Sequence, residues 1–123
     1  MRFKACTVVG AWVVEPEPHN EDRGHFMRSW CIDEFSARGI DFQPAQANAG
    51  FSIRKGTIRG LRYQVAPALE AKLVRCTRGS IFDLVADLRP DSPTYLQWHG
   101  LVLTPDCGTM LYTSSKDSGL QAA

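Results

Sequence analysis

The sequence lacks several features that would each define a class of protein. No apolar run approaches the length of a membrane span, and the first residues lack the apolar core of a secretory signal. The four cysteines are widely and unevenly spaced, and no Cys-x-x-Cys pair exists. This spacing argues against a zinc ribbon and favours a reducing compartment. We therefore expect a soluble, cytoplasmic protein with no membrane partner.

The chain also lacks a large net charge, because 14 Lys and Arg residues face 13 Asp and Glu residues, giving +1 at pH 7. A nucleic-acid-binding domain usually carries a basic excess, so nucleic acid is not the expected partner. The positive charge is nevertheless concentrated. Around residues 56–74 the only acid is Glu70, and half of the basic residues lie there: Arg54, Lys55, Arg59, Arg62, Lys72, Arg75 and Arg78. Such a basic window in a neutral chain favours a pocket for an anionic small molecule.

Helical patterns are scarce. The only candidate is residues 33–38, with Asp33 as a possible cap and Gly39 as a stop. Elsewhere, β-branched and aromatic runs separated by Gly and Pro every ~8 to 12 residues are typical of an all-β sandwich or barrel. The length predicts a single domain over residues 1–123, with a frayed tail at 114–123. The predicted strands are 7–9, 12–14, 25–30, 42–48, 51–53, 57–64, 71–77, 81–88, 95–103 and 109–112.

The predicted strand 57–64 contains a conflict. Arg59 and Arg62 are three positions apart and would point to opposite faces of a regular strand. Gly60 between them would tolerate a bulge that turns both side chains toward one side. We therefore predict a bulge or a strong local twist at this glycine.

Eight short motifs follow one another along the chain, and together they resemble the dTDP-4-dehydrorhamnose 3,5-epimerase family. The resemblance implies a cupin-type jelly roll that acts on dTDP-linked 4-keto-6-deoxy sugars. It also implies a C-terminally shortened barrel, because family members continue through further strands. The motifs are Asp22-Arg-Gly-x-Phe26, Gln46-x-Asn48, Gly56-x-x-Arg-Gly-Leu-x-Tyr-Gln64, Lys72-Leu-Val74, Gly79-x-x-x-Asp83, Asp87-Leu-Arg89, Ser92-Pro-Thr94 and Trp98.

The resemblance implies roles for six of these residues. Arg23 and Phe26 look like the pair that holds the diphosphate and thymine, donated across a homodimer interface by a swapped N-terminal strand. Lys72 looks like the cation beside the sugar 4-keto oxygen, where enolate charge develops. An arginine guanidinium can donate two parallel hydrogen bonds to phosphate oxygens, so arginines are suited to binding a nucleotide diphosphate. The pyrophosphate and sugar contacts that the resemblance implies are Gln46, Asn48 and Arg59. The Asp87 and Ser92 motifs are expected to be strand-end and turn architecture.

The chain departs from the family at the catalytic base. In the family a histidine stands immediately before the Tyr-Gln pair and removes protons beside the ketone, whereas this chain has Arg62. A guanidinium stays protonated and cannot accept that proton. The family's aspartate partner and tyrosine acid lie beyond this chain's end, and serine stands near the place of a second histidine. The expectation is therefore an impaired or inactive epimerase that still binds its ligand.

Two alternatives remain open. A relocated base, with Tyr63 or Asp83 as the nearest choice, would keep the chain an active isomerase, although Asp83 could instead pair with Arg62 or Lys72. A non-enzymatic subunit could only dimerise, for example with a full-length paralogue. The three histidines, His19, His25 and His99, are expected to be surface or loop residues. No cofactor is expected, and the His-x-His pattern of a cupin metal site is missing.

Overall fold

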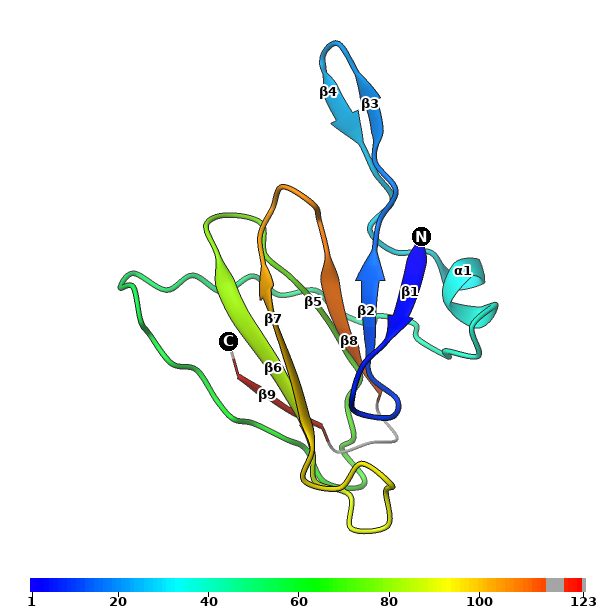
Figure 1. Cartoon of the computed structure of the whole chain (residues 1–123), viewed down its shortest axis with the longest axis vertical. Helices are drawn as coiled ribbons and strands as arrows, with labels where there is room; N and C mark the ends of the chain where they lie inside the picture. Colours follow the sequence, from blue (N-terminus) through cyan, green and yellow to red (C-terminus); the bar gives the residue numbers. More distant parts are fainter. Residues whose placement is uncertain (115–118, 123) are drawn as a thin grey trace.

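The computed structural model describes residues 1–114 and 119–122 and is built almost entirely of β-strands. One short helix, α1 (Ile32–Ser36), follows the first four strands (Figure 1). The all-β prediction with at most one helix is thus confirmed. The strands are β1 (Arg2–Ala5), β2 (Trp12–Glu15), β3 (His19–Glu21), β4 (Gly24–Phe26), β5 (Lys72–Arg75), β6 (Ile81–Asp87), β7 (Trp98–Leu103), β8 (Met110–Thr113) and β9 (Gly119–Ala122).

The strands form two larger sheets and a hairpin. The first sheet has the order β1-β2-β8-β5 and the second the order β7-β6-β9, with every neighbouring pair antiparallel. In the first sheet Val14 of β2 lies opposite Met110 of β8, and Val74 of β5 lies opposite Leu111. The strand β8 is therefore central, with partners on both sides.

Both faces of β8 are covered, and all four of its residues are buried. Met110 and Tyr112 belong to a core cluster that also contains Phe35 of α1. Leu111 belongs to a second cluster, which includes Val85 of β6. Because successive side chains on a strand point to opposite faces, β8 lies between a helix-side layer and the β7-β6-β9 sheet.

The hairpin β3-β4 projects beyond one end of the two sheets (Figure 1). All of its residues are exposed. Its base lies against Gly108, where Met27 and Pro16 pack closely around a backbone with φ +63°. The hairpin thus leaves the body at a tightly packed point.

The helix differs in detail from the predicted one. It begins one residue earlier, with extended Cys31 as its N-cap and no side-chain capping bond, so Asp33 lies inside the first turn and does not cap it. Gly39 follows with φ +73°, as expected of a residue that ends a helix. Fully buried Phe35 fixes the helix by edge contacts with the rings of Phe3 and Tyr112.

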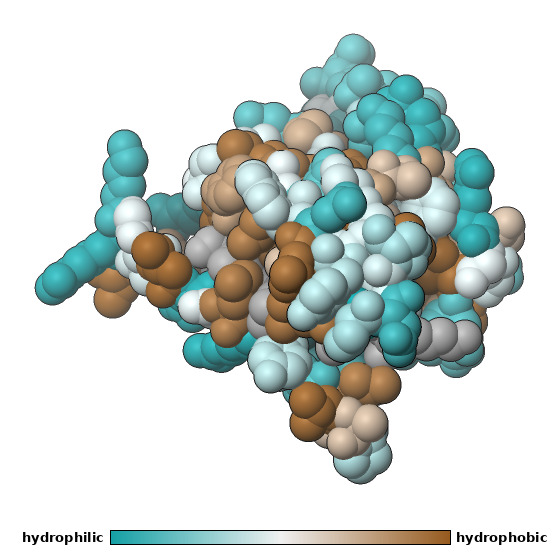
Figure 2. Space-filling view, turned by 60° about the horizontal axis from the view of Figure 1, so that its bottom comes forward, coloured by the Kyte–Doolittle hydropathy of each residue, from teal (hydrophilic) through white to brown (hydrophobic). Residues whose placement is uncertain are grey.

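Three predicted strands, 42–48, 51–53 and 57–64, are absent. From α1 to β5 the chain forms no helix or strand beyond a single bridge at Arg62, and every residue from 43 to 70 is exposed. Strand formation depends on a neighbour that pairs and packs, and beyond the single bridge at Arg62 no described strand pairs with this segment. The bulge or strong local twist predicted for a strand at Gly60 is therefore also wrong, because residues 57–64 form no strand. Apolar side chains remain at the surface here, among them Phe51, Ile53 and Ile58. Figure 2 shows one face of the molecule, on which apolar and polar surfaces are interspersed.

Two smaller predictions also differ. Residues 7–9 form the turn between β1 and β2 and not a strand, and Val8 is buried in the second core cluster. The tail predicted to fray contains β9, which pairs with β6, whereas 115–118 and 123 lie outside the described residues. Within the described part of the chain, no helix has the length and apolar character needed to cross a membrane.

Candidate functional site

Two predicted binding residues lie on the projecting hairpin. Arg23 occupies the turn between β3 and β4, and its Nη2 atom lies 3.0 Å from each carboxylate oxygen of Glu21. Phe26, at the end of β4, has 75% of its surface exposed. Neither side chain packs into the body of its own chain, so both are available to a ligand or to a second molecule.

Four more predicted residues, Gln46, Asn48, Arg59 and Arg62, lie in the irregular segment and are exposed. Arg59 is held by its own segment, because its Nε donates to Ser52 Oγ at 2.9 Å and its Nη2 donates to the Phe51 carbonyl at 2.7 Å. These bonds orient the guanidinium without neutralising it, since neither acceptor carries a charge.

Lys72 begins β5 and points between the two sheets. The next residue, Leu73, packs against the helix-side core, so Lys72 lies on the opposite face. Its Nζ is 3.9 Å from Glu70 Oε1, and Gln64 donates to the other oxygen of Glu70 at 2.5 Å. The Glu70 contact is not among the predicted contacts of Lys72, although opposite charges two positions apart at a strand start are a usable signal.

Asp83 points into the same interior from β6. It is 2% exposed; its Oδ1 accepts a hydrogen bond from the Leu84 amide at 3.1 Å, and its Oδ2 has no partner among the described residues. Burial raises the pKa of this carboxyl to about 6, against the smaller lowering effects of the Leu84 bond and of the Lys72 charge. An orphaned buried carboxylate oxygen requires an explanation.

The structure thus brings together only part of the predicted site. Lys72 and Asp83 both turn toward the interior from opposing sheets, and the Lys72 charge slightly lowers the pKa of Asp83. No salt bridge joins Asp83 to Lys72 or Arg62, and no hydrogen bond or ion pair links Arg59 to Lys72 within residues 1–114. The predicted basic strand pair is absent, because 57–64 is not a strand.

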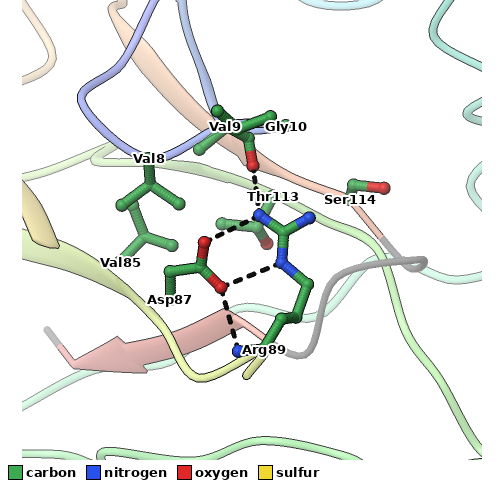
Figure 3. A pocket seen from close by; sticks show the side chains of 9 residues that line it. Val8, Val9, Gly10, Val85, Asp87, Arg89, Thr113 and Ser114 are labelled. Atoms are coloured by element: carbon green, nitrogen blue, oxygen red, sulfur yellow. Dashed lines mark hydrogen bonds and ion pairs between the residues drawn. The ribbon is translucent and has the colours of Figure 1, made fainter. Parts of the chain in front are cut away.

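A shallow hollow lies elsewhere, between the β1-β2 turn and the end of β6 (Figure 3). Its floor is the buried Asp87, whose Oδ1 accepts bonds from the amide and the Nε of Arg89 at 3.0 and 2.9 Å. Oδ2 accepts from Ser92 Oγ at 2.5 Å and from Thr94 Oγ1 at 2.7 Å. Burial raises the pKa of Asp87, but the bonds from Arg89, Ser92 and Thr94 together outweigh it and hold that pKa below its usual range. This network is turn architecture, as the sequence predicted.

The comparisons with known proteins decide the family. The family model described as dTDP-4-dehydrorhamnose 3,5-epimerase matches residues 5–117. This chain belongs to the dTDP-4-dehydrorhamnose 3,5-epimerase family. A dTDP-4-dehydrorhamnose 3-epimerase of Streptomyces niveus is 38% identical over 115 residues, covering 93% of this chain and 55% of the relative.

Solved structures of the epimerase family share the fold. The Bacillus anthracis enzyme with TDP and PPi bound superposes with a TM-score of 0.86 and 32% identity, covering 96% of this chain and 69% of that one. The Legionella pneumophila enzyme, in complex with dTDP-4-keto-L-rhamnose, gives a TM-score of 0.86 and 28% identity over 98% of this chain and 63% of that one. The predicted cupin-type fold is therefore confirmed.

This epimerase-family chain spans about half the length of the curated relatives that it matches. The roles expected for Arg23, Phe26, Gln46, Asn48, Arg59, Arg62 and Lys72 stay predictions. Among residues 1–114 and 119–122, no group of three or more His, Cys, Asp or Glu side chains is placed to hold a metal ion.

Proposed function

We propose that the chain binds a dTDP-linked 4-keto-6-deoxy sugar. The observation that carries this proposal is the family match over residues 5–117, within which Lys72 is turned toward the interior between the sheets. Family structures hold TDP and PPi in one case and dTDP-4-keto-L-rhamnose in another. The ligand is thus a nucleoside diphosphate sugar with a ketone, and each of its parts requires a different kind of contact.

The hairpin supplies the nucleotide contacts to a second copy of the chain. Phe26 is exposed and can stack on a thymine base, and Arg23 can pair with a diphosphate oxygen once Glu21 is displaced. The hairpin projects away from its own sheets, which suits an exchange between two protomers (Figure 1). The functional unit on this proposal is a homodimer with exchanged N-terminal strands.

The remaining contacts come from the body. Arg59, oriented by Ser52 and the Phe51 carbonyl, is assigned to the pyrophosphate together with Gln46 and Asn48. Lys72 is assigned to the sugar, where an ammonium group stabilises negative charge on the 4-keto oxygen. This assignment requires the exposed segment 43–70 to close toward β5 when ligand binds.

Arg62 weakens proton transfer in this proposal. Removing a proton beside a ketone needs a base within hydrogen-bond reach, and a guanidinium cannot serve. Arg62 instead adds a cation near the diphosphate. We therefore assign to this chain ligand binding with weakened epimerase chemistry. The cytoplasmic location stays a prediction.

Calorimetry with dTDP tests the binding. We expect binding to the wild-type chain, a loss of at least about tenfold in affinity for Arg59→Ala, and little change for the control Arg54→Ala in the same exposed segment. A folded wild-type sample that shows no heat of binding would remove the proposal.

Deuterium incorporation from heavy water into dTDP-4-keto-6-deoxyglucose tests the chemistry. The expected result is exchange far slower than that of an active family enzyme assayed in parallel. If the chain exchanges deuterium as fast as the active enzyme, another residue supplies the base. The variant Tyr63→Phe would then test whether that base is Tyr63, the residue next to Arg62.

A further inference from the structure

Lys72 and Asp83 form a pair of opposite charges that no hydrogen bond joins. Lys72 enters the interior from β5 and Asp83 from β6, so the two belong to opposing sheets. Asp83 is 2% exposed, and its Oδ2 is the buried side-chain oxygen left without a partner among the described residues. Burying a carboxylate lowers the free energy of unfolding unless a nearby cation or a hydrogen-bond donor compensates for the lost hydration.

Among residues 1–114, the other inward-facing polar groups already have partners. On β6 itself, Asp87 is bound by Arg89. On β7, His99 shares the inward face with Val85 opposite it, and its Nδ1 lies 3.3 Å from Thr7 Oγ1. Beyond β5, Cys76 donates to the Arg78 carbonyl at 3.2 Å. The side chains that β8 turns inward, Leu111 and Thr113, do not titrate. Among the inward-facing side chains of residues 1–114, Lys72 is therefore the cation that can balance Asp83.

We propose that Asp83 is a positioning residue for Lys72, whose buried carboxylate holds the ammonium group between the two sheets and directs it toward the bound sugar. Glu70 competes for the same ammonium from the solvent side, at 3.9 Å, but it is 40% exposed and its attraction is screened. Buried Asp83 is screened far less. The pair thus favours an inward Lys72, and Glu70 is released when ligand arrives.

The role assigned to Asp83 differs from that of a base. Its carboxylate touches neither the sugar nor a reacting proton and acts through Lys72. The predicted effect of Asp83 on ligand affinity rests on the proposed function. The attraction between Asp83 and Lys72 does not, because it exists in the free protein. Burial raises the pKa of Asp83, and the Lys72 charge lowers it by a smaller amount, which places Lys72 within electrostatic reach of the carboxylate.

A carboxyl titration by ¹³C NMR tests the pair without any ligand. In the intact protein Asp83 should titrate near pH 6, and Lys72→Met, which keeps the length and removes the charge, should raise that midpoint by about half a pH unit or more. The matched control Glu70→Gln should leave it unchanged within about 0.2 pH units. An unmoved Asp83 midpoint in Lys72→Met would overturn the inference.

A ligand experiment then tests the consequence. Asp83→Asn keeps the shape of the side chain and removes its charge. We expect the affinity of this variant for dTDP to stay within about twofold of wild type. The ratio of its affinity for the dTDP-4-keto sugar to its affinity for dTDP should fall at least about fivefold. Equal losses for both ligands, or no loss for the keto sugar, would contradict a positioning role. If wild type binds no dTDP, the proposed function fails while the ligand-free titration still decides the pairing. The same titration decides it if Asp83→Asn does not fold.

Discussion

The guanidinium of Arg89 donates a hydrogen bond to the Val9 carbonyl at 2.6 Å while its Nε donates to Asp87 at 2.9 Å. The bond joins the ends of two sheets, since Val9 lies in the turn between β1 and β2 of the first sheet and Asp87 ends β6 of the second (Figure 3). The bond therefore closes the end of the β-sandwich, and its strength depends on an ionised Asp87.

Substituting Asp87 by Asn should destabilise the protein by about 2 to 4 kcal/mol, because the amide cannot accept every bond that Arg89, Ser92 and Thr94 donate. Urea denaturation followed by tryptophan fluorescence measures the loss. The exposed Asp91→Asn is the matched control and should change stability by less than about 0.5 kcal/mol.

Acid should remove the difference between wild type and Asp87→Asn. The folded pKa of Asp87 lies below its ordinary value of 3.8, so its stabilisation is present above that pH and is lost as the pH falls through the folded pKa. The stability of the two proteins should therefore begin to converge below about pH 4 and continue to do so as the pH falls further. A constant gap down to pH 2 would show that the charge of Asp87 is not what stabilises the turn.

Asp83 should show the opposite pH dependence. Its folded pKa of about 6 lies above the ordinary 3.8, so folding is favoured while the group is protonated, and stability falls as the pH rises between those values. Asp83→Asn does not titrate and should be more stable than wild type above pH 6 by about 1 to 3 kcal/mol, with little difference at pH 4. Urea midpoints at pH 4 and pH 8 provide the measurement, and a gap that is equal at both pH values would contradict it.

Gly108 should not tolerate a side chain. Its φ of +63° is unfavourable for any other residue, and an added Cβ would lie 2.7 Å from the Met27 terminal carbon and 3.0 Å from a Pro16 ring carbon. Gly108→Ala should cost about 1 to 3 kcal/mol in thermal or urea unfolding. Gly79→Ala, at a similar φ but with open space around it, separates backbone strain from crowding.

Arg62→His should increase deuterium exchange into the 4-keto sugar. A neutral imidazole can take the proton that a guanidinium cannot, and a placed general base contributes about 10² to 10⁴ in rate. Arg54→His, in the same exposed segment, is the control and should not change the rate. No gain in a variant that still binds dTDP would show that the substitution at position 62 is not what limits the chemistry.

The sequence predicted best those strands that are buried on at least one face. The predicted strands 81–88 and 109–112 correspond to β6 and β8, whose partners are present, with Val85 packing near Leu111 across the sheets. The glycine at position 39 correctly predicted the end of the helix. The predicted cap, Asp33, was wrong, because α1 is stabilised by the burial of Phe35 and has no side-chain capping bond.

The segment 43–70 was mispredicted for a physical reason. Its β-branched and aromatic residues have strand propensity, but a strand forms only where a neighbour accepts its hydrogen bonds. Sequence spacing also could not reveal that Lys72 and Asp83 turn toward the same interior from two sheets, because that arrangement depends on how the sheets pack. Their inward direction follows from Leu73 and Val85, whose burial only the fold establishes.

The double coverage of β8 has a consequence for local opening. To expose the amides of Leu111 or Tyr112, the chain must separate β8 from β2 and β5 and also unpack both core layers. These backbone protons should therefore be among the slowest to exchange with solvent, and their rate should report global unfolding. The projecting hairpin, by contrast, can fray or reorient without disturbing β8.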